Sequence, residues 1–231
     1  MASKRRIARA YGYVAARSVT WDYDRVELIA DGAVHAIGVS LGLIGAVAIV
    51  IMAARWAAHD IPAIVIYAAG LLAMLGCSAA YNLWPLSPVK WMLRRFDHSA
   101  IYLMIAGTYT PLIGQLKDGA ASVGLLVGVW LTAAVGVALK LLMPGRFDRF
   151  AIVLYLILGW SCVLAYGPIS AALPNASLWL LAAGGVLYST GVVFHVWRTL
   201  RFHNAIWHGF VLAAACCHYW AVLACGVFGH A

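Results

Sequence analysis

Long apolar stretches separated by short polar segments run along almost the whole chain. Seven of them reach about 20 mostly apolar residues, the length that an α-helix needs to cross the hydrocarbon core of a bilayer. They cover residues 31–53, 61–83, 97–116, 120–142, 150–173, 177–197 and 205–228. The segments between them are short and polar or contain proline, which leaves no room for a soluble domain. The pattern predicts an all-α integral membrane protein, a seven-transmembrane helix bundle.

The composition agrees with this fold class. Hydrophobic residues make up 65% of the 231 residues and charged residues 10%, whereas a soluble domain carries roughly 25% charged residues. The 16 Lys and Arg outnumber the 8 Asp and Glu. In a membrane protein such an excess is typical of cytoplasmic loops, so we expect no nucleic acid as a partner. The 5 cysteines lie in apolar stretches without a CxxC motif, and we expect no disulfide framework.

Lys and Arg also predict the orientation, because they concentrate on the cytoplasmic side of membrane proteins. With seven spans and a cytoplasmic N-terminus, all but two of them fall on the cytoplasmic side, the exceptions being Arg55 and Lys117. The C-terminus is then outside. Residues 1–25 are expected to form a basic cytoplasmic tail, and residues 26–231 the membrane domain.

Small residues and prolines predict local features of the bundle. Small side chains let membrane helices approach closely, and proline kinks or ends a helix. Pro111 and Pro168 are therefore expected to disturb the third and fifth helices. The small residues are Gly38, Gly42 and Gly45 on the first helix, and the small-xxx-small pair Gly124 and Gly128 on the fourth.

Polar side chains gather at one depth of this predicted bundle. Three pairs of residues are four apart, which places each pair on one face of its helix. Asp97 begins the third helix at the same cytoplasmic side. Ionisable groups inside a membrane are costly and point to function, and His with Asp is a donor set for metal-assisted hydrolysis. The three pairs are Asp31 with His35, Ser78 with Asn82, and Asn204 with His208.

Plainer explanations stay open for several of these residues. Asp31 and Asp97 would also serve as helix N-terminal caps. His218 lies ten residues beyond His208 and about 15 Å deeper along the helix. Its alternative role is structural, as a hydrogen-bond partner of a neighbouring helix. The remaining histidines are expected at the membrane interface or beyond it, and they are His98, His195 and His203 on the cytoplasmic side and His59 and His230 on the other.

Four motifs resemble those of one family. The pattern of bacterial hemolysin III proteins, seven-helix members of the progestin and adipoQ receptor family, is closely matched by FDHSAIYLMIAGTYTP at residues 96–111. The family's motifs on helices seven, two and one are similar to NAIWHGFVLAAACCHY (204–219), CSAAYN (77–82) and residues 27–35. The resemblance extends over about residues 24–228.

This resemblance implies a zinc site near the cytoplasmic leaflet. Members of the family hold zinc with one His at the end of the helix-two motif and two His four apart on helix seven. An Asp of helix three, near the metal, holds or activates a water molecule, and a Ser of helix two lies beside the metal. In this chain the second helix-seven His is His208, the Asp is Asp97 and the Ser is Ser78.

The chain departs from the family pattern at the other two ligand positions, which are Asn82 and Asn204. A neutral amide is a poor zinc ligand compared with imidazole, thiolate or carboxylate. Two alternatives follow. Either the site holds no metal and is kept together by hydrogen bonds, or a rearranged divalent-metal site uses Asp31 as a substitute ligand in the set Asp31, His35, Asp97 and His208.

The resemblance implies a multi-pass protein of a bacterial inner membrane with membrane lipids as partners. The leading hypothesis is a ceramidase-like hydrolase of lipid amides, with Asp97, Ser78 and His35 as catalytic groups and His208 as a metal ligand. The alternative is a non-enzymatic sensor or regulator of membrane homeostasis or energetics, with a metal-free, proton-linked site. Retinal is excluded because helix seven has no Lys for a Schiff base. Haem is not expected, and no oligomeric state is predicted.

Overall fold

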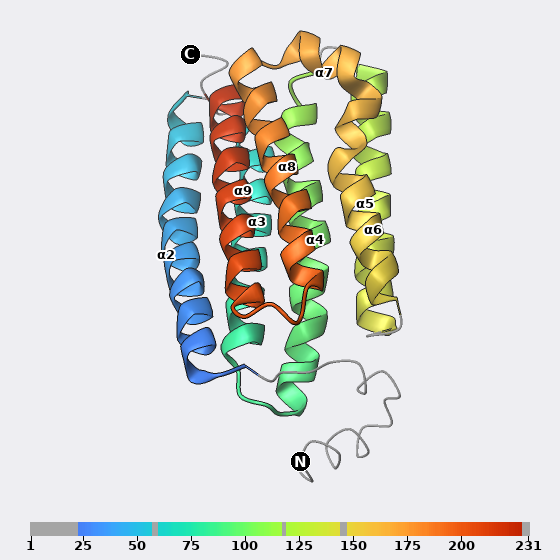
Figure 1. Cartoon of the computed structure of the whole chain (residues 1–231). Coiled ribbons are helices and arrows are strands. Elements are labelled where there is room, and N and C mark those ends of the chain that lie inside the picture. Colours follow the sequence, from blue (N-terminus) through green and yellow to red (C-terminus); the bar gives the residue numbers. More distant parts are fainter. Residues whose placement is uncertain (1–22, 57–59, 117–118, 144–146, 228–231) are drawn as a thin grey trace.

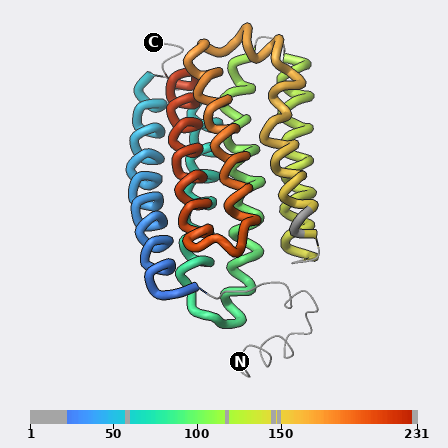
Figure 2. Tube along the Cα trace, viewed as in Figure 1, coloured from blue at the N-terminus to red at the C-terminus, as the bar shows by residue number. Residues whose placement is uncertain are grey.

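The computed structural model of the chain describes residues 23–56, 60–116, 119–143 and 147–227, and all regular structure in these ranges is helical. Figure 1 shows the long helices lying side by side in one bundle, and the tube in Figure 2 follows the same path. The elements are α2 (Arg25–Trp56), α3 (Ile61–Leu83), α4 (Pro88–Ile113), α5 (Gly119–Leu142), α6 (Asp148–Trp160), η3 (Ser161–Ala165), α7 (Tyr166–Ala172), α8 (Asn175–Val196) and α9 (His203–Gly226).

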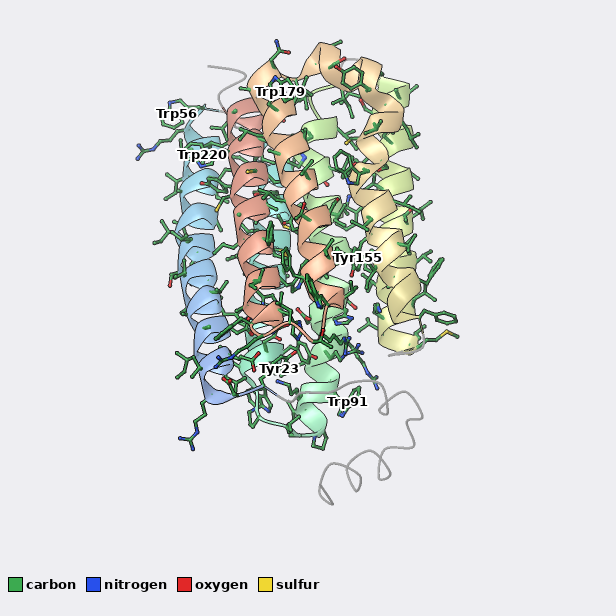
Figure 3. The ribbon with its side chains drawn as sticks, viewed as in Figure 1. Tyr23, Trp56, Trp91, Tyr155, Trp179 and Trp220 are labelled. Carbon is green, nitrogen blue, oxygen red and sulfur yellow. The ribbon has the colours of Figure 1, made fainter. Side chains whose placement is uncertain are left out.

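Length and composition suit these helices to a membrane. Six segments of the described chain are long and apolar enough to cross one, which confirms an all-α membrane protein. The 26-residue α4 is not in that set, because Lys90, Arg94 and Asp97 are among the polar residues that lower its hydropathy. Large aromatic side chains flank the bundle at both ends (Figure 3), as expected where Trp and Tyr meet the two membrane interfaces.

The start of α2 is tied to the start of α9. Asp24 and Glu27 form a reciprocal capping box, in which each carboxylate accepts a hydrogen bond from the other's backbone N–H at 2.8 and 2.9 Å. The hydrogen bond from the Glu27 N–H, and after it the Arg201 guanidinium, hold the pKa of the Asp24 carboxyl below its usual value. Glu27 also accepts a hydrogen bond from the backbone N–H of Phe202, and Arg201 forms an ion pair with Asp24 at 3.0 Å. The two helices that carry most of the polar cluster therefore begin side by side.

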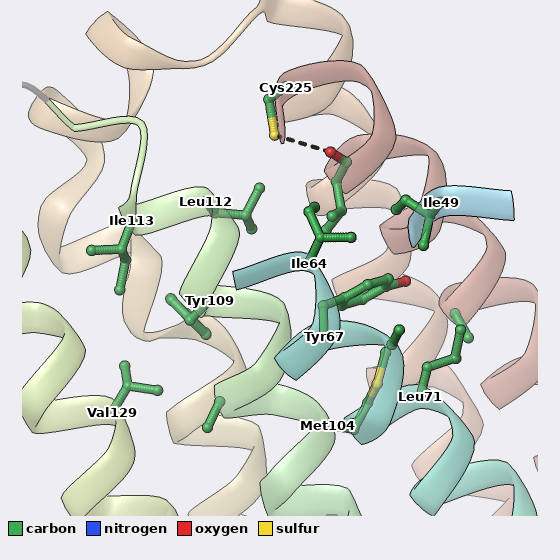
Figure 4. Packing of buried hydrophobic residues seen from close by; sticks show 14 of the residues in the cluster. Ile49, Ile64, Tyr67, Leu71, Met104, Tyr109, Leu112, Ile113, Val129 and Cys225 are labelled. Carbon is green, nitrogen blue, oxygen red and sulfur yellow. Dashed lines mark hydrogen bonds between the residues drawn. The ribbon is translucent and has the colours of Figure 1, made fainter. Parts of the chain in front are cut away.

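Glycines allow the closest helix contacts, though not all the predicted ones. A Cβ at Gly42 would overlap the Leu75 side chain, and a Cβ at Gly45 would lie 3.1 Å from the Tyr219 ring, so the prediction for α2 is confirmed. The prediction for α5 is wrong, because a Cβ at Gly124 or Gly128 would meet no atom of the described chain within 4 Å. The side chains between the helices form the apolar core of Figure 4.

The predicted fifth helix is broken in the middle. α6 ends at Trp160, and a 3₁₀ turn, η3, leads into α7, whose first turn contains Pro168. The Tyr109 hydroxyl of α4 donates to the carbonyls of Leu158 and Gly159 at 3.3 and 3.1 Å, and it accepts the backbone N–H of Cys162 at 2.7 Å. A side chain from α4 thus hydrogen-bonds to backbone groups on both sides of the break.

Replacing Tyr109 with Phe is expected to destabilise the protein by about 1–3 kcal/mol, because the partly buried Cys162 N–H and the Gly159 carbonyl lose a hydrogen-bond partner. Thermal unfolding in detergent, followed by circular dichroism, measures the change. Tyr166→Phe removes a hydroxyl from an exposed side chain and is the matched control. An equal melting temperature for the two variants would contradict the role given to Tyr109.

Candidate functional site

The three pairs of polar residues predicted to share helix faces meet at one end of the bundle. Asp31 and His35 come from α2, Ser78 and Asn82 from the last turns of α3, and Asn204 and His208 from the first turns of α9. α9 packs against α2 and α4, and α2 packs against α3. Residues that are far apart in sequence are thereby brought together in one cluster.

Asp31 is at the centre of this cluster. Its side chain is buried, and its Oδ1 lies 2.6 Å from Nδ1 of His208. Its Oδ2 accepts a hydrogen bond from Nδ2 of Asn204 at 2.9 Å and lies 3.6 Å from Nε2 of His35. The centroids of the two imidazole rings are 4.3 Å apart, and their planes are tilted by 53° to each other. A buried carboxylate is costly unless it is paired or hydrogen-bonded, and here both of its oxygens have partners.

The two amides connect Asp31 to α3. Asn204 Nδ2 also donates to Oδ1 of Asn82 at 3.1 Å, and Asn82 Nδ2 donates to the carbonyl of Ser78 at 2.9 Å. The second ring nitrogen of His208, Nε2, lies 3.5 Å from both Ser78 Oγ and Asn82 Nδ2. The residues at the predicted ligand positions, 82 and 204, thus form a hydrogen-bonded network around His208.

Lys90 supports this network in a way that the sequence did not reveal. Its ammonium group is buried and donates to three carbonyls at the end of α3, those of Tyr81, Asn82 and Trp84, at 2.8–3.0 Å. A cation at a helix C-terminus is stabilised by the helix dipole. Lys90 was expected to be a loop residue that sets orientation, whereas it caps the helix end that carries Asn82.

A cavity of about 320 Å³ opens from the polar cluster into the bundle. At one end it is lined by His35, Ser78, Asp97 and His208, and farther along by apolar side chains that reach Leu173. Asp97 therefore faces the same space as the cluster, with its Oδ2 3.8 Å from Nε2 of the adjacent His98. This volume is in the range of small-ligand pockets, roughly 300–1,000 Å³. Its lining, polar at one end and mostly apolar elsewhere, suits a molecule with a polar head and an apolar chain.

Three of these side chains form a possible metal-binding group. One ligand atom each from Asp31, His35 and His208 lie within 4.8 Å of one another, and all three residues are buried. His35 Nε2 has no hydrogen-bond partner. Asp97, the fourth residue of the predicted rearranged site, is not in this group. The group supports a possible cation site in the protein.

The other histidines have varied environments. His218 lies on the cavity, and its Nε2 is 3.3 Å from the carbonyl of Leu181, so the hydrogen bond to a neighbouring helix that was one alternative for this residue is present. His203 is buried at the start of α9 beside Tyr23, and His195, half-buried near the end of α8, packs against Trp207 and lines the cavity. His59 and His230 lie outside the described residues, as do residues 1–22 of the predicted tail.

Comparison with known proteins gives a consistent picture. The family model for "Haemolysin-III related" proteins matches residues 27–219. The "Hemolysin-3 homolog" of Bacillus subtilis is 39% identical over 199 residues, which are 85% of this chain and 93% of that protein. "Hemolysin-3" of Bacillus cereus is 33% identical over 198 residues, 85% of this chain and 90% of that protein. The human "Monocyte to macrophage differentiation factor" is 31% identical over 163 residues, 68% of this chain and 67% of that protein.

Proposed function

The chain belongs to the haemolysin-III related family, as a hemolysin III-type member of the wider progestin and adipoQ receptor family, and on this premise we propose that it is a bacterial inner-membrane hydrolase of lipid amides. In this proposal α4 also crosses the membrane and brings the number of spans to seven, since it packs in the bundle against α3 and α5. The distribution of Lys and Arg then places the N-terminus and the polar cluster on the cytoplasmic side.

One observation carries the proposal: an apolar cavity inside the bundle ends at a cluster of catalytic-type side chains. The acyl chain of a lipid would lie along the apolar lining toward Leu173, and its head group would meet Ser78, Asp97 and His208. A polar head and an apolar tail would each find matching surroundings. A site that only bound the head group at the membrane surface would not need this depth.

The zinc site that the family implies does not fit these residues. At positions 82 and 204 the side chains are amides, and their N–H groups have no lone pair to give to a metal. Asn82 Nδ2 faces Nε2 of His208 at 3.5 Å, and Asn204 Nδ2 donates to Asp31. A cation held instead by Asp31, His35 and His208 would compete with the hydrogen bonds that already engage both Asp31 oxygens. We therefore propose that the chain acts without tightly bound zinc.

The side chains of the cluster can carry the hydrolysis themselves. Asp31 accepts the Nδ1–H of His208, so that the lone pair of His208 Nε2 faces the cavity side of the cluster. His208 would take a proton from the attacking oxygen and return it to the departing amine. His35 Nε2, which is buried without a hydrogen-bond partner and lies 3.6 Å from Asp31 Oδ2, would donate to the head group of the lipid. Asp97, which lines the cavity with Ser78 and His208, would orient a water molecule.

The proposal is tested with the purified chain in lipid nanodiscs and a long-chain ceramide as substrate, by measuring the release of fatty acid. The wild-type protein is expected to turn the substrate over, and Asp97→Ala with His208→Ala is expected to lose at least about 100-fold, the usual effect of removing acid–base groups. Thr132→Ala, on the exposed face of α5 and away from the cavity, is the control. Full activity in the double variant would refute the proposal.

A second candidate function is a proton-linked membrane sensor. The observation that favours it is the position of Asp31 between two imidazoles, His35 and His208, since a proton gained there would reorganise the hydrogen bonds among α2, α3 and α9. A sensor would show a pH-dependent structural change and no turnover of any lipid amide. The ceramide assay therefore separates the two functions.

A further inference from the structure

We infer that Ser78, His208 and Asp31 form a nucleophile–base–carboxylate triad, and that the hydrolysis passes through an acyl group on Ser78. This inference deepens the proposed function and rests on it for the substrate class. It differs from metal-assisted attack by water, because the attacking oxygen belongs to the protein. The three residues come from three helices, α3, α9 and α2.

The geometry has the order that such a triad requires. Asp31 Oδ1 lies 2.6 Å from Nδ1 of His208, and Nε2 on the opposite side of the same ring lies 3.5 Å from Ser78 Oγ. The carboxylate selects the tautomer with the proton on Nδ1, which leaves the Nε2 lone pair toward the serine hydroxyl. Nucleophile–base distances are often long without substrate and shorten in the reactive complex.

The surroundings of Ser78 suit a nucleophile. Ser78 lines the cavity, so that a carbonyl group of a bound lipid can reach its hydroxyl. Asn82 Nδ2 donates one N–H to the Ser78 carbonyl at 2.9 Å, and it lies 3.4 Å from Ser78 Oγ and 3.5 Å from His208 Nε2, so that its second N–H holds the nucleophile and the base next to each other. Asn204 holds both Asp31 and Asn82, at 2.9 and 3.1 Å. The two amides at the family's ligand positions thereby acquire a role in supporting the triad.

The chemical steps balance without a metal. Ser78 Oγ forms a bond to the amide carbon while its proton passes to His208 Nε2, and the carbonyl electron pair moves onto the oxygen. When this intermediate collapses, the C–N bond breaks and the proton on Nε2 goes to the leaving amine. Water then attacks the ester on Ser78, giving one proton to His208, and the released acid leaves Ser78 with its hydroxyl restored. The sum is amide plus water to acid plus amine.

The test uses the full chain in nanodiscs and two readouts. A fluorophosphonate probe, which modifies activated serine hydroxyls, is expected to label Ser78, as located by mass spectrometry of peptides. Ser78→Ala should lose at least tenfold of the labelling and on the order of 10³-fold of ceramide hydrolysis. Ser170→Ala removes a hydroxyl on α7 that does not line the cavity, and this variant should keep both the labelling and the hydrolysis at the wild-type level. Hydrolysis by the wild-type chain should be unchanged after treatment with a zinc chelator.

The outcomes separate this inference from the proposed function. Hydrolysis that is lost with the chelator, in a chain whose Ser78 takes no label, would overturn the triad while the hydrolase stands. Equal labelling of wild type and Ser78→Ala would also overturn it. Labelling at Ser78 without turnover of ceramide would support the nucleophile and remove ceramide amides as the substrate. An acyl group trapped on Ser78 of the wild-type chain would support it even if Ser78→Ala folded poorly.

Discussion

Replacing Asp31 with Asn is expected to lower kcat for lipid-amide hydrolysis by on the order of 10³–10⁴-fold with little change in KM. The carboxylate lies 2.6 Å from His208 Nδ1 and fixes the ring with its proton on that nitrogen. An Asn amide would offer an N–H at the same place and favour the opposite tautomer, in which Nε2 carries the proton and cannot accept another. Steady-state kinetics measures the split between kcat and KM, and nitrogen NMR of labelled His208 reports the tautomer.

The control for this variant is Asp60→Asn, which removes a carboxylate that bonds Gln115 at the opposite end of α3. It should leave kcat, KM and the His208 tautomer unchanged. If Asp31→Asn altered the melting temperature but neither kcat nor the tautomer, then Asp31 would be a structural carboxylate and the positioning role assigned to it would be wrong. The tautomer measurement matters because a merely structural group would not change it.

The polar residues of the cluster were predictable from spacing because a helix fixes which residues share a face. Asp31 with His35, Ser78 with Asn82, and Asn204 with His208 are each four apart, so each pair had to point in one direction once its helix formed. The charge pattern then suggested that all three pairs lie at one depth. The structure brings the three pairs together, as that reasoning expected.

Contacts between helices were not predictable in the same way. Whether Asp31 would bond to His208, to His35 or only cap its own helix depends on how closely α2 approaches α9, and that depends on packing of residues far apart in sequence. The break after Trp160 depends on Tyr109 of another helix. Gly124 and Gly128 are exposed, although their spacing predicted a helix contact. A small-residue motif allows a helix to pack closely, but it does not determine whether another helix lies against it.

Restoring imidazoles at positions 82 and 204 is expected to create a zinc site that the natural chain lacks. The side chains concerned already converge, with Asn204 Nδ2 3.1 Å from Asn82 Oδ1 and Asn82 Nδ2 3.5 Å from His208 Nε2. Ligand nitrogens of a tetrahedral zinc ion are about 3.4 Å apart when each lies about 2.1 Å from the metal. Elemental analysis of the purified protein with Asn82→His and Asn204→His should therefore find about one zinc ion per chain, against background amounts in the wild-type protein.

The same double variant discriminates between the two chemistries of the site, because zinc on His208 Nε2 would occupy the lone pair that the triad needs. In the zinc-loaded double variant, labelling of Ser78 by the fluorophosphonate probe should be low, and a chelator should restore it. Asn82→Gln with Asn204→Gln keeps amides at both positions and is the matched control that should bind no zinc. Stoichiometric zinc in the wild-type chain would contradict this account, since it would mean that Asp31, His35 and His208 release their hydrogen bonds to hold the metal.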